Sequence, residues 1–160
     1  MMLRLAQLRR DERGASVIEM ALVAPFLATL VIGMVDLSRG YSAKLQLEQA
    51  AQRSIEKAMQ GKKEVDLYQT LKDEAAAAAG VATTAVTVKY WLECNGVSQY
   101  TTQASMTTDF EKVCPSGQQY SRYVDVSITK NYAPMFRTKF LGSKSDGTFD
   151  LVGKAGIRVQ

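Results

Sequence analysis

A largely apolar run from Ala15 to Val35 constrains the fold of this chain more than any other feature of its sequence. As an α-helix, these 21 residues would be about 31 Å long, and the hydrocarbon core of a membrane is about 30 Å thick. The run contains one charged residue, Glu19, and a carboxylate at membrane depth is costly enough to suggest a function. The sequence therefore predicts one transmembrane helix with a functional acidic residue near its start.

Basic residues are distributed unevenly around this run. Arg39 and Lys44 are the nearest ones that follow it, whereas four arginines precede it, namely Arg4, Arg9, Arg10 and Arg13. Because the cytoplasmic flank of a membrane helix carries the excess of lysine and arginine, the N-terminus is expected in the cytoplasm. Residues 36–160 would then form a domain on the opposite side of the membrane.

The junction between the basic segment and the apolar run has a distinctive pattern. Gly14 is followed by small residues, an aliphatic pair and then Glu19, in the order Arg13-Gly14-Ala15-Ser16-Val17-Ile18-Glu19-Met20. This pattern resembles the processing site of type IV prepilins. Together with Pro25 and the rest of the helix, it is similar to the TadE-like family of minor pilins, or pseudopilins, of tight-adherence (Flp, type IVb) pili.

The resemblance implies a function in assembling a pilus used for surface attachment. A prepilin peptidase would remove residues 1–14 as a leader by cutting between Gly14 and Ala15, and Glu19 would guide subunit assembly. The mature protein would span the bacterial inner membrane once, with residues 15–35, and place residues 36–160 in the periplasm or in an extracellular pilus. Its partners would be the prepilin peptidase, other Tad/Flp pilins and pseudopilins, the inner-membrane assembly platform and the lipid bilayer.

Two departures separate the chain from neighbouring families. Met20 follows Glu19 where major Flp pilins usually have tyrosine, and these pilins are little more than the helix, whereas about 120 residues follow it here. Ala15-Ser16 replaces the Phe-Thr-Leu that follows the cleaved glycine in type IVa pilins and type II secretion pseudopilins. The pattern therefore favours the TadE-like family over these relatives.

Pro25 lies in the middle of the predicted span. Because proline has no backbone N–H, it leaves the carbonyl of Ala21 without its helical donor and is expected to kink or loosen the helix there. This feature is either a simple kink or a point at which the helix can melt when subunits pack into a filament.

Two other interpretations of the apolar run stay open. An ordinary secretory signal has a shorter apolar core, of about 7–15 residues, and the only small-residue site after the run, Gly40-Tyr41-Ser42, is weak. A single-pass anchor displaying a periplasmic binding or enzymatic domain would explain the span and its orientation. It gives no reason, however, for Gly14 beside Ala15 or for Glu19.

The composition argues against an enzyme. The chain has no histidine, which excludes Ser-His-Asp and Cys-His catalysis and any histidine-containing metal site. Its two cysteines cannot close a zinc site alone, and its carboxylates form no close pair typical of glycosidases or Mg²⁺ sites, so no cofactor or metal is expected. Removing the leader, with its four arginines and two acidic residues, lowers the formal charge from +4 to +2. No basic patch with interleaved aromatic residues indicates a nucleic-acid partner.

Beyond the membrane, helical periodicity continues and then changes to that of strands. The first helix is expected to reach Met59, and a second one ends at Gly80. The apolar stripe of the first helix is formed by Leu37, Tyr41, Leu45, Glu48, Ala51, Ile55 and Met59. Alternating residues predict strands at 86–94, 124–129 and 149–159, the last with a gap at Gly153. The expected fold is α+β and pilin-like, with a three- to four-stranded antiparallel sheet packed on the helical spine.

Cys94 and Cys114 bracket a polar loop between the first two predicted strands. In a domain outside the cytoplasm, this arrangement is typical of a disulfide, which in the chain-entropy model would contribute about 3 kcal/mol. Two free buried thiols would instead suit a cytoplasmic domain, which the predicted topology disfavours. Trp91 falls on the polar face of the first strand, where it is more often an edge cover than a binding residue.

Overall fold

The computed structural model describes residues 13–60, 65–99, 106–135 and 142–159. Contacts divide the chain into two units, Met1–Arg39 and Gly40–Gln160. The helix α2, Arg13–Gln60, begins in the first unit and ends in the second, without a break at Gly40. Residues 1–12 of the predicted leader lie outside the described residues.

In the second unit, α2 packs through a face made of small and medium-sized apolar residues. Leu47, Ala50, Ala51 and Ile55 are all buried, and the hydroxyl of Ser54 beside them donates a hydrogen bond to the carbonyl of Ala50 at 2.8 Å. Such a bond satisfies a hydroxyl that would otherwise be costly to bury. Of the predicted apolar stripe, Ala51 and Ile55 are therefore buried, whereas Leu37, Tyr41 and Leu45 are exposed. The side chain of Met59, at the end of the stripe, lies outside the described residues.

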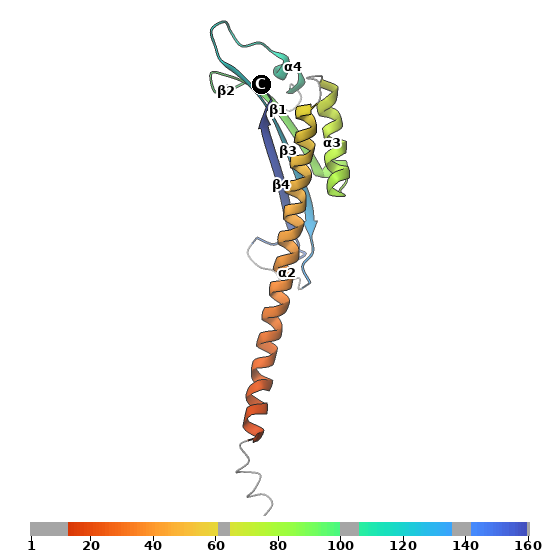
Figure 1. Ribbon diagram of the computed structural model, residues 1–160, viewed down its shortest axis with the longest axis vertical. Coiled ribbons are helices and arrows are strands. Elements are labelled where there is room, and N and C mark those ends of the chain that lie inside the picture. The colour runs from red at the N-terminus through yellow and green to blue at the C-terminus, as the bar shows by residue number, and fades with distance from the viewer. Residues whose placement is uncertain (1–12, 61–64, 100–105, 136–141, 160) are drawn as a thin grey trace, which may run out of the picture. The chain divides into compact units, whose positions relative to one another are not determined.

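The second helix, α3, spans Val65–Ala79 and lies beside the upper part of α2 (Figure 1). Ala75 and Ala76 are buried in the same cluster as the apolar face of α2, which explains why the alanine-rich run suits close packing. Gly80 ends the helix as predicted, with φ +62, and Val81 N–H donates to the Ala76 carbonyl at 3.0 Å. This bond and positive φ are those of a Schellman C-terminal cap.

The predicted α+β fold is confirmed by an antiparallel sheet of four strands. These are β1 (Val86–Cys94), β2 (Val97–Ser98), β3 (Tyr120–Tyr132) and β4 (Phe149–Arg158), in the order β2-β1-β3-β4. A single 3-10 turn, η1 (Thr83–Ala85), precedes β1, and a short helix, α4 (Met106–Glu111), lies between β2 and β3. The middle strand β3 is longer at both ends than the predicted 124–129, because its outer residues pair with β1 at one end and β4 at the other.

The alternation of side chains gives the sheet one packed face and one polar face. Residues 124, 126 and 128 of β3 are fully buried, with Val86 and Leu92 of β1 on the same side. On the other face, Trp91 stacks on Tyr123 with ring centroids 5.3 Å apart, and its indole N–H donates to Glu93 at 2.9 Å. Trp91 therefore lies on the polar face, as the sequence predicts, and covers the neighbouring strand.

Gly153 marks the place where β4 comes closest to α2. A Cβ atom added to Gly153 would lie 2.6 Å from both the backbone nitrogen of Glu48 and the Cβ of Leu47. Real Cβ atoms essentially never come that close to a neighbour. The gap that the sequence shows in this strand is therefore a contact at which only glycine lets strand and helix backbones meet.

The turn before β4 uses an acidic side chain to hold its shape. The Asp146 carboxylate accepts hydrogen bonds from the Thr148 hydroxyl at 2.7 Å and from the Thr148 backbone N–H at 3.1 Å. These bonds lower the pKa of Asp146 below its usual value. The carboxylate therefore closes a turn, and Asn131 of β3 joins it by donating to the Thr148 hydroxyl at 2.8 Å.

Candidate functional site

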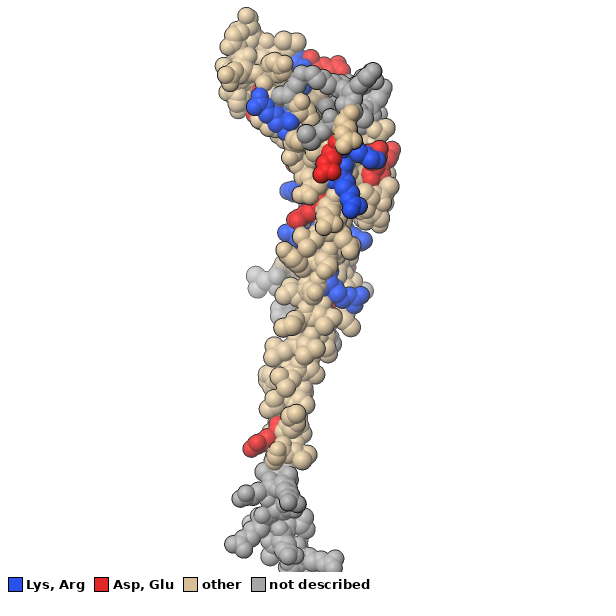
Figure 2. All heavy atoms as spheres, in the orientation of Figure 1, with Lys and Arg blue, Asp and Glu red and all other residues tan. Residues whose placement is uncertain are grey.

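The first unit presents a helix whose described side chains are almost entirely exposed and apolar. Figure 2 shows this part of α2 as a long tan stretch with one acidic patch near the grey residues. One helix of the described chain, residues 16–57, is long and apolar enough to cross a membrane, and the apolar window within it is not buried by the protein. Its large exposed residues include Val17, Ile18, Met20, Leu22, Phe26, Leu30 and Met34. A surface of this kind is stable only in lipid or against other helices.

Glu19 is the only charged residue between Gly14 and Val35, and it is exposed. The backbone at Gly14 and Ala15 is helical, so Glu19 follows Ala15 by four residues, or about 6 Å along the axis. Residues four apart share one face of a helix. A positive charge at residue 15 would therefore lie close to the Glu19 carboxylate of the same helix.

Pro25 lies inside α2, which is assigned as helix on both sides of it. Four residues further on, the Thr29 hydroxyl donates to the carbonyl of Phe26 at 2.8 Å. A threonine hydroxyl that bonds back to its own helix is satisfied without water, as a membrane segment requires. The prediction that the helix melts or bends at Pro25 during assembly stays a prediction.

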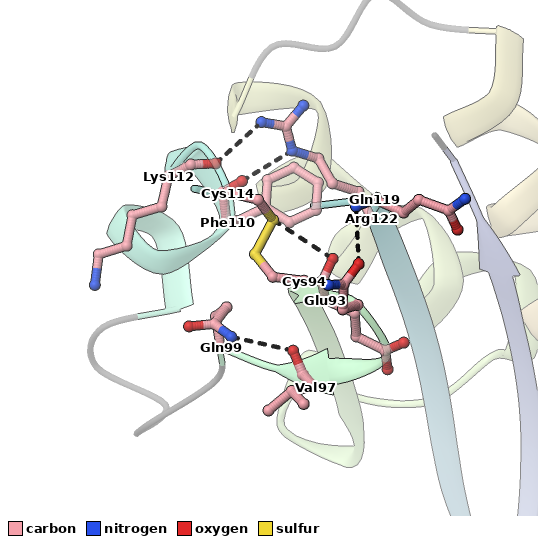
Figure 3. Close-up of a disulfide and its surroundings, with 10 residues drawn as sticks. Glu93, Cys94, Val97, Gln99, Phe110, Lys112, Cys114, Gln119 and Arg122 are labelled. Carbon is pink, nitrogen blue, oxygen red and sulfur yellow. Dashed lines mark hydrogen bonds between the residues drawn. A yellow bond between two sulfur atoms is a disulfide. The ribbon is translucent and has the colours of Figure 1, made fainter. Parts of the chain in front are cut away.

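At the end of the sheet where β1 stops and β3 begins, the structure joins Cys94 to Cys114 in a disulfide, as Figure 3 shows. The two Cα atoms are 5.6 Å apart, and the bond ties the end of β1 to the segment after α4. Beside it, Asn95 donates its backbone N–H to the Gln119 carbonyl at 2.8 Å, and its side chain accepts from Gln119 N–H at 2.9 Å. The base of the loop is therefore closed both covalently and by hydrogen bonds.

Arg122 of β3 holds α4 against the sheet, a role that the sequence alone does not reveal. Its Nε donates to the carbonyl of Phe110 at 3.0 Å, and its guanidinium lies 5.5 Å from the centre of the Phe110 ring (Figure 3). Phe110 is buried and meets Tyr90 edge-on at 5.3 Å. The loop that the sequence predicts as polar thus contributes a core residue, and Arg122 fixes it through a carbonyl and a ring.

A single carboxylate is buried among the described residues, and its surroundings are structural. Asp109 of α4 is 3% exposed and forms an ion pair with Lys112 at 2.7 Å. In the described ranges, no three His, Cys, Asp or Glu side chains come together in a way that could hold a metal ion. The described residues thus combine an exposed apolar helical segment that contains one acid, Glu19, with a disulfide-linked domain.

Loss of the disulfide should weaken the second unit without changing the apolar part of α2. The bond closes a loop of 20 residues, for which chain entropy gives about 3 kcal/mol. We expect the Cys94→Ser and Cys114→Ser double variant to unfold at lower urea concentration by about that free energy, measured by fluorescence of Trp91. An unchanged midpoint, or thiols that react without reductant in the parent chain, would contradict the prediction.

Residues 14–55 match the family model described as TadE-like protein. The match begins at Gly14 and includes Glu19, Pro25 and the buried face of α2, and it covers 42 of the 160 residues. This confirms the resemblance stated from the sequence. No curated protein and no solved structure matches the chain significantly.

Proposed function

We propose, with the TadE-like character of residues 14–55 as the premise, that this chain is a minor pilin, or pseudopilin, of a tight-adherence type IVb pilus. A prepilin peptidase removes the leader, and the mature chain joins other pilins on the inner-membrane assembly platform. The chain acts by assembly and not by catalysis. Its domain from residue 36 onward lies in the periplasm or in the filament.

The observation that carries this proposal is the coincidence of three features at one junction. The family match starts at Gly14, the exposed apolar run of residues 15–35 starts immediately after it, and the only acid of that run is Glu19. A plain anchor needs the helix but neither the glycine nor the acid. Processing followed by assembly needs all three, because cutting after Gly14 creates an amine beside Glu19.

The competing function is a single-pass anchor that displays a periplasmic binding or enzymatic domain. It shares the apolar helix and its orientation with the pilin proposal. The two differ in the N-terminus of the mature protein, since only a prepilin acquires a new end at Ala15. The N-terminus therefore separates them more directly than any assay of binding.

We expect intact-mass analysis of the membrane-extracted protein to show loss of residues 1–14 in cells that contain the prepilin peptidase, and the full chain in cells that lack it. Glycine suits a scissile junction because it allows close approach of the backbone. Gly14→Val should therefore block the cut. Gly33→Val, a matched control in the same helix with open space around it, should be processed normally.

A mature protein that retains Arg13, or that starts near Ala43, would overturn the proposed processing. The first result would favour the plain anchor, and the second would favour cleavage of an ordinary secretory signal.

A further inference from the structure

The end of the second unit nearest the predicted membrane span is rich in aromatic and other apolar side chains. Gly40 of α2 faces Tyr132 of β3, because a Cβ on Gly40 would lie 3.4 Å from its ring. Tyr132 pairs with Phe149 across the sheet, and Met135 follows three residues later. Tyr41 and Met135 are 63% and 60% exposed. We call Tyr41, Tyr132, Met135 and Phe149 the proximal end.

Two contacts fix which end of the sheet this is. Tyr132 lies at Gly40, whereas Gly153, which pairs with Ile128, lies at Leu47. Seven residues of helix are about 10 Å long, and four residues of strand are about 13 Å long, so within the second unit β3 runs back toward Gly40 as α2 runs away from it.

Chain length limits how far the proximal end can be from the bilayer. Five residues separate Val35, the last residue of the apolar run, from Gly40. As helix they measure about 8 Å, and even a fully extended chain would measure no more than about 18 Å. The headgroup region adds about 5–8 Å to each side of the hydrocarbon core. The proximal end is therefore at or just above the headgroups, whatever the angle between the two units.

We infer that the proximal end is a lipid-contacting surface that seats the second unit on the outer leaflet from which α2 emerges. The inference rests on the membrane anchoring in the proposed function. Tyrosine suits this depth, because its ring is apolar and its hydroxyl reaches water and headgroups. Two exposed bases lie near this end: Lys130, two residues before Tyr132 on β3, and Lys44, four residues after Gly40, which also pairs with Glu48 at 3.7 Å. Their long stems can lie along lipid while their charges meet anionic phosphates.

If the proximal end contacts lipid, a fluorophore placed there should be quenched by lipid-borne nitroxides more than a fluorophore at the opposite end of the sheet. The full-length, disulfide-bonded chain would be placed in vesicles of phosphatidylethanolamine and phosphatidylglycerol, with a fluorophore on a cysteine introduced by Met135→Cys. The matched control is Val97→Cys, which is 63% exposed and lies in β2, at the opposite end of the sheet. A lipid carrying a nitroxide on its headgroup should quench the label at 135 several-fold more than the label at 97.

Two further labels make each outcome decisive. Tyr41→Cys should behave like Met135→Cys, and Leu30→Cys, within the span, should be quenched by a nitroxide deep in the acyl chains. Equal quenching at 135 and 97 with normal quenching at 30 would overturn the lipid contact and leave the anchoring intact. Loss of quenching at 30 would overturn both. A blue-shifted but unquenched label at 135 would indicate that a protein covers this end, and would also overturn the inference.

Discussion

Gly153→Ala is expected to lower the free energy of unfolding of the second unit by about 3 kcal/mol or more, at or above the upper end of typical overpacking costs. The new Cβ would overlap the backbone at Leu47 and Glu48, and backbone atoms of a helix cannot move aside as a flexible side chain can. Relief would need β4 or α2 to move outward, which would open the cluster around Leu47, Val126 and Ile128. The melting temperature should fall by about 10 °C or more, measured by circular dichroism of the detergent-solubilised chain.

Gly156→Ala is the matched control for this substitution. It lies on the same strand but on the other face, is exposed, and its nearest contact is a carboxylate oxygen of Asp125 at 3.2 Å. That side chain can rotate away, so the change in unfolding free energy should stay within about 0.5 kcal/mol. Equal effects at the two positions would show that the close approach of helix and strand does not limit what residue 153 can be.

The parts of this fold that the sequence predicts well are those with a strong period. The alternation from Val86 to Cys94 predicts β1 with its bounds, and Gly80 predicts the end of α3, because in both cases the local pattern is strong. The apolar run likewise predicts the helix of the first unit. These patterns mark the elements in the sequence, although β1 pairs along its whole length with β3 and α3 packs against α2.

The parts that the sequence does not predict depend on contacts between distant segments. Tyr41 and Leu45 continue the predicted helical spacing, yet they are exposed although they lie between Gly40, which meets Tyr132, and Leu47, which meets Gly153. Arg122 of β3 donates to the carbonyl of Phe110 in α4, twelve residues earlier in the chain. No local sequence pattern predicts this contact. Periodicity shows which residues share a face of the helix but not which side of that helix the sheet covers.

One missed element had a local signal. Asn95-Gly96 connects β1 to β2, with φ of 50 at Asn95 and 78 at Gly96. Two positive values in succession are those of a type I′ hairpin turn, for which Asn-Gly is the preferred dipeptide. The short strand β2 could therefore have been predicted from these two residues, inside a loop that its polar composition alone marks as irregular.

Glu19→Ala is expected to abolish pilus assembly while leaving membrane insertion intact. Under the proposed function, cleavage creates an amine at Ala15, and a neighbouring subunit shifted along the filament axis places its amine against the Glu19 carboxylate. Each charge offsets the cost of burying the other, and removing one partner of a buried pair costs about 3–5 kcal/mol. That corresponds to association weaker by a factor of about a hundred or more. Pilus formation would be scored by electron microscopy in cells whose only copy is the variant.

Two further substitutions distinguish the charge from the side chain itself. Glu19→Gln keeps the size and polarity of the side chain but not its charge. If the ion pair drives assembly, this variant should form almost as few pili as Glu19→Ala. Glu56→Ala removes an exposed acid from the same helix beyond the span, and it should assemble normally. Intact-mass analysis should show that all three variants are processed. Normal piliation of the Glu19→Ala strain would mean that this carboxylate merely reaches the membrane interface, and the assembly role inferred for it would be wrong.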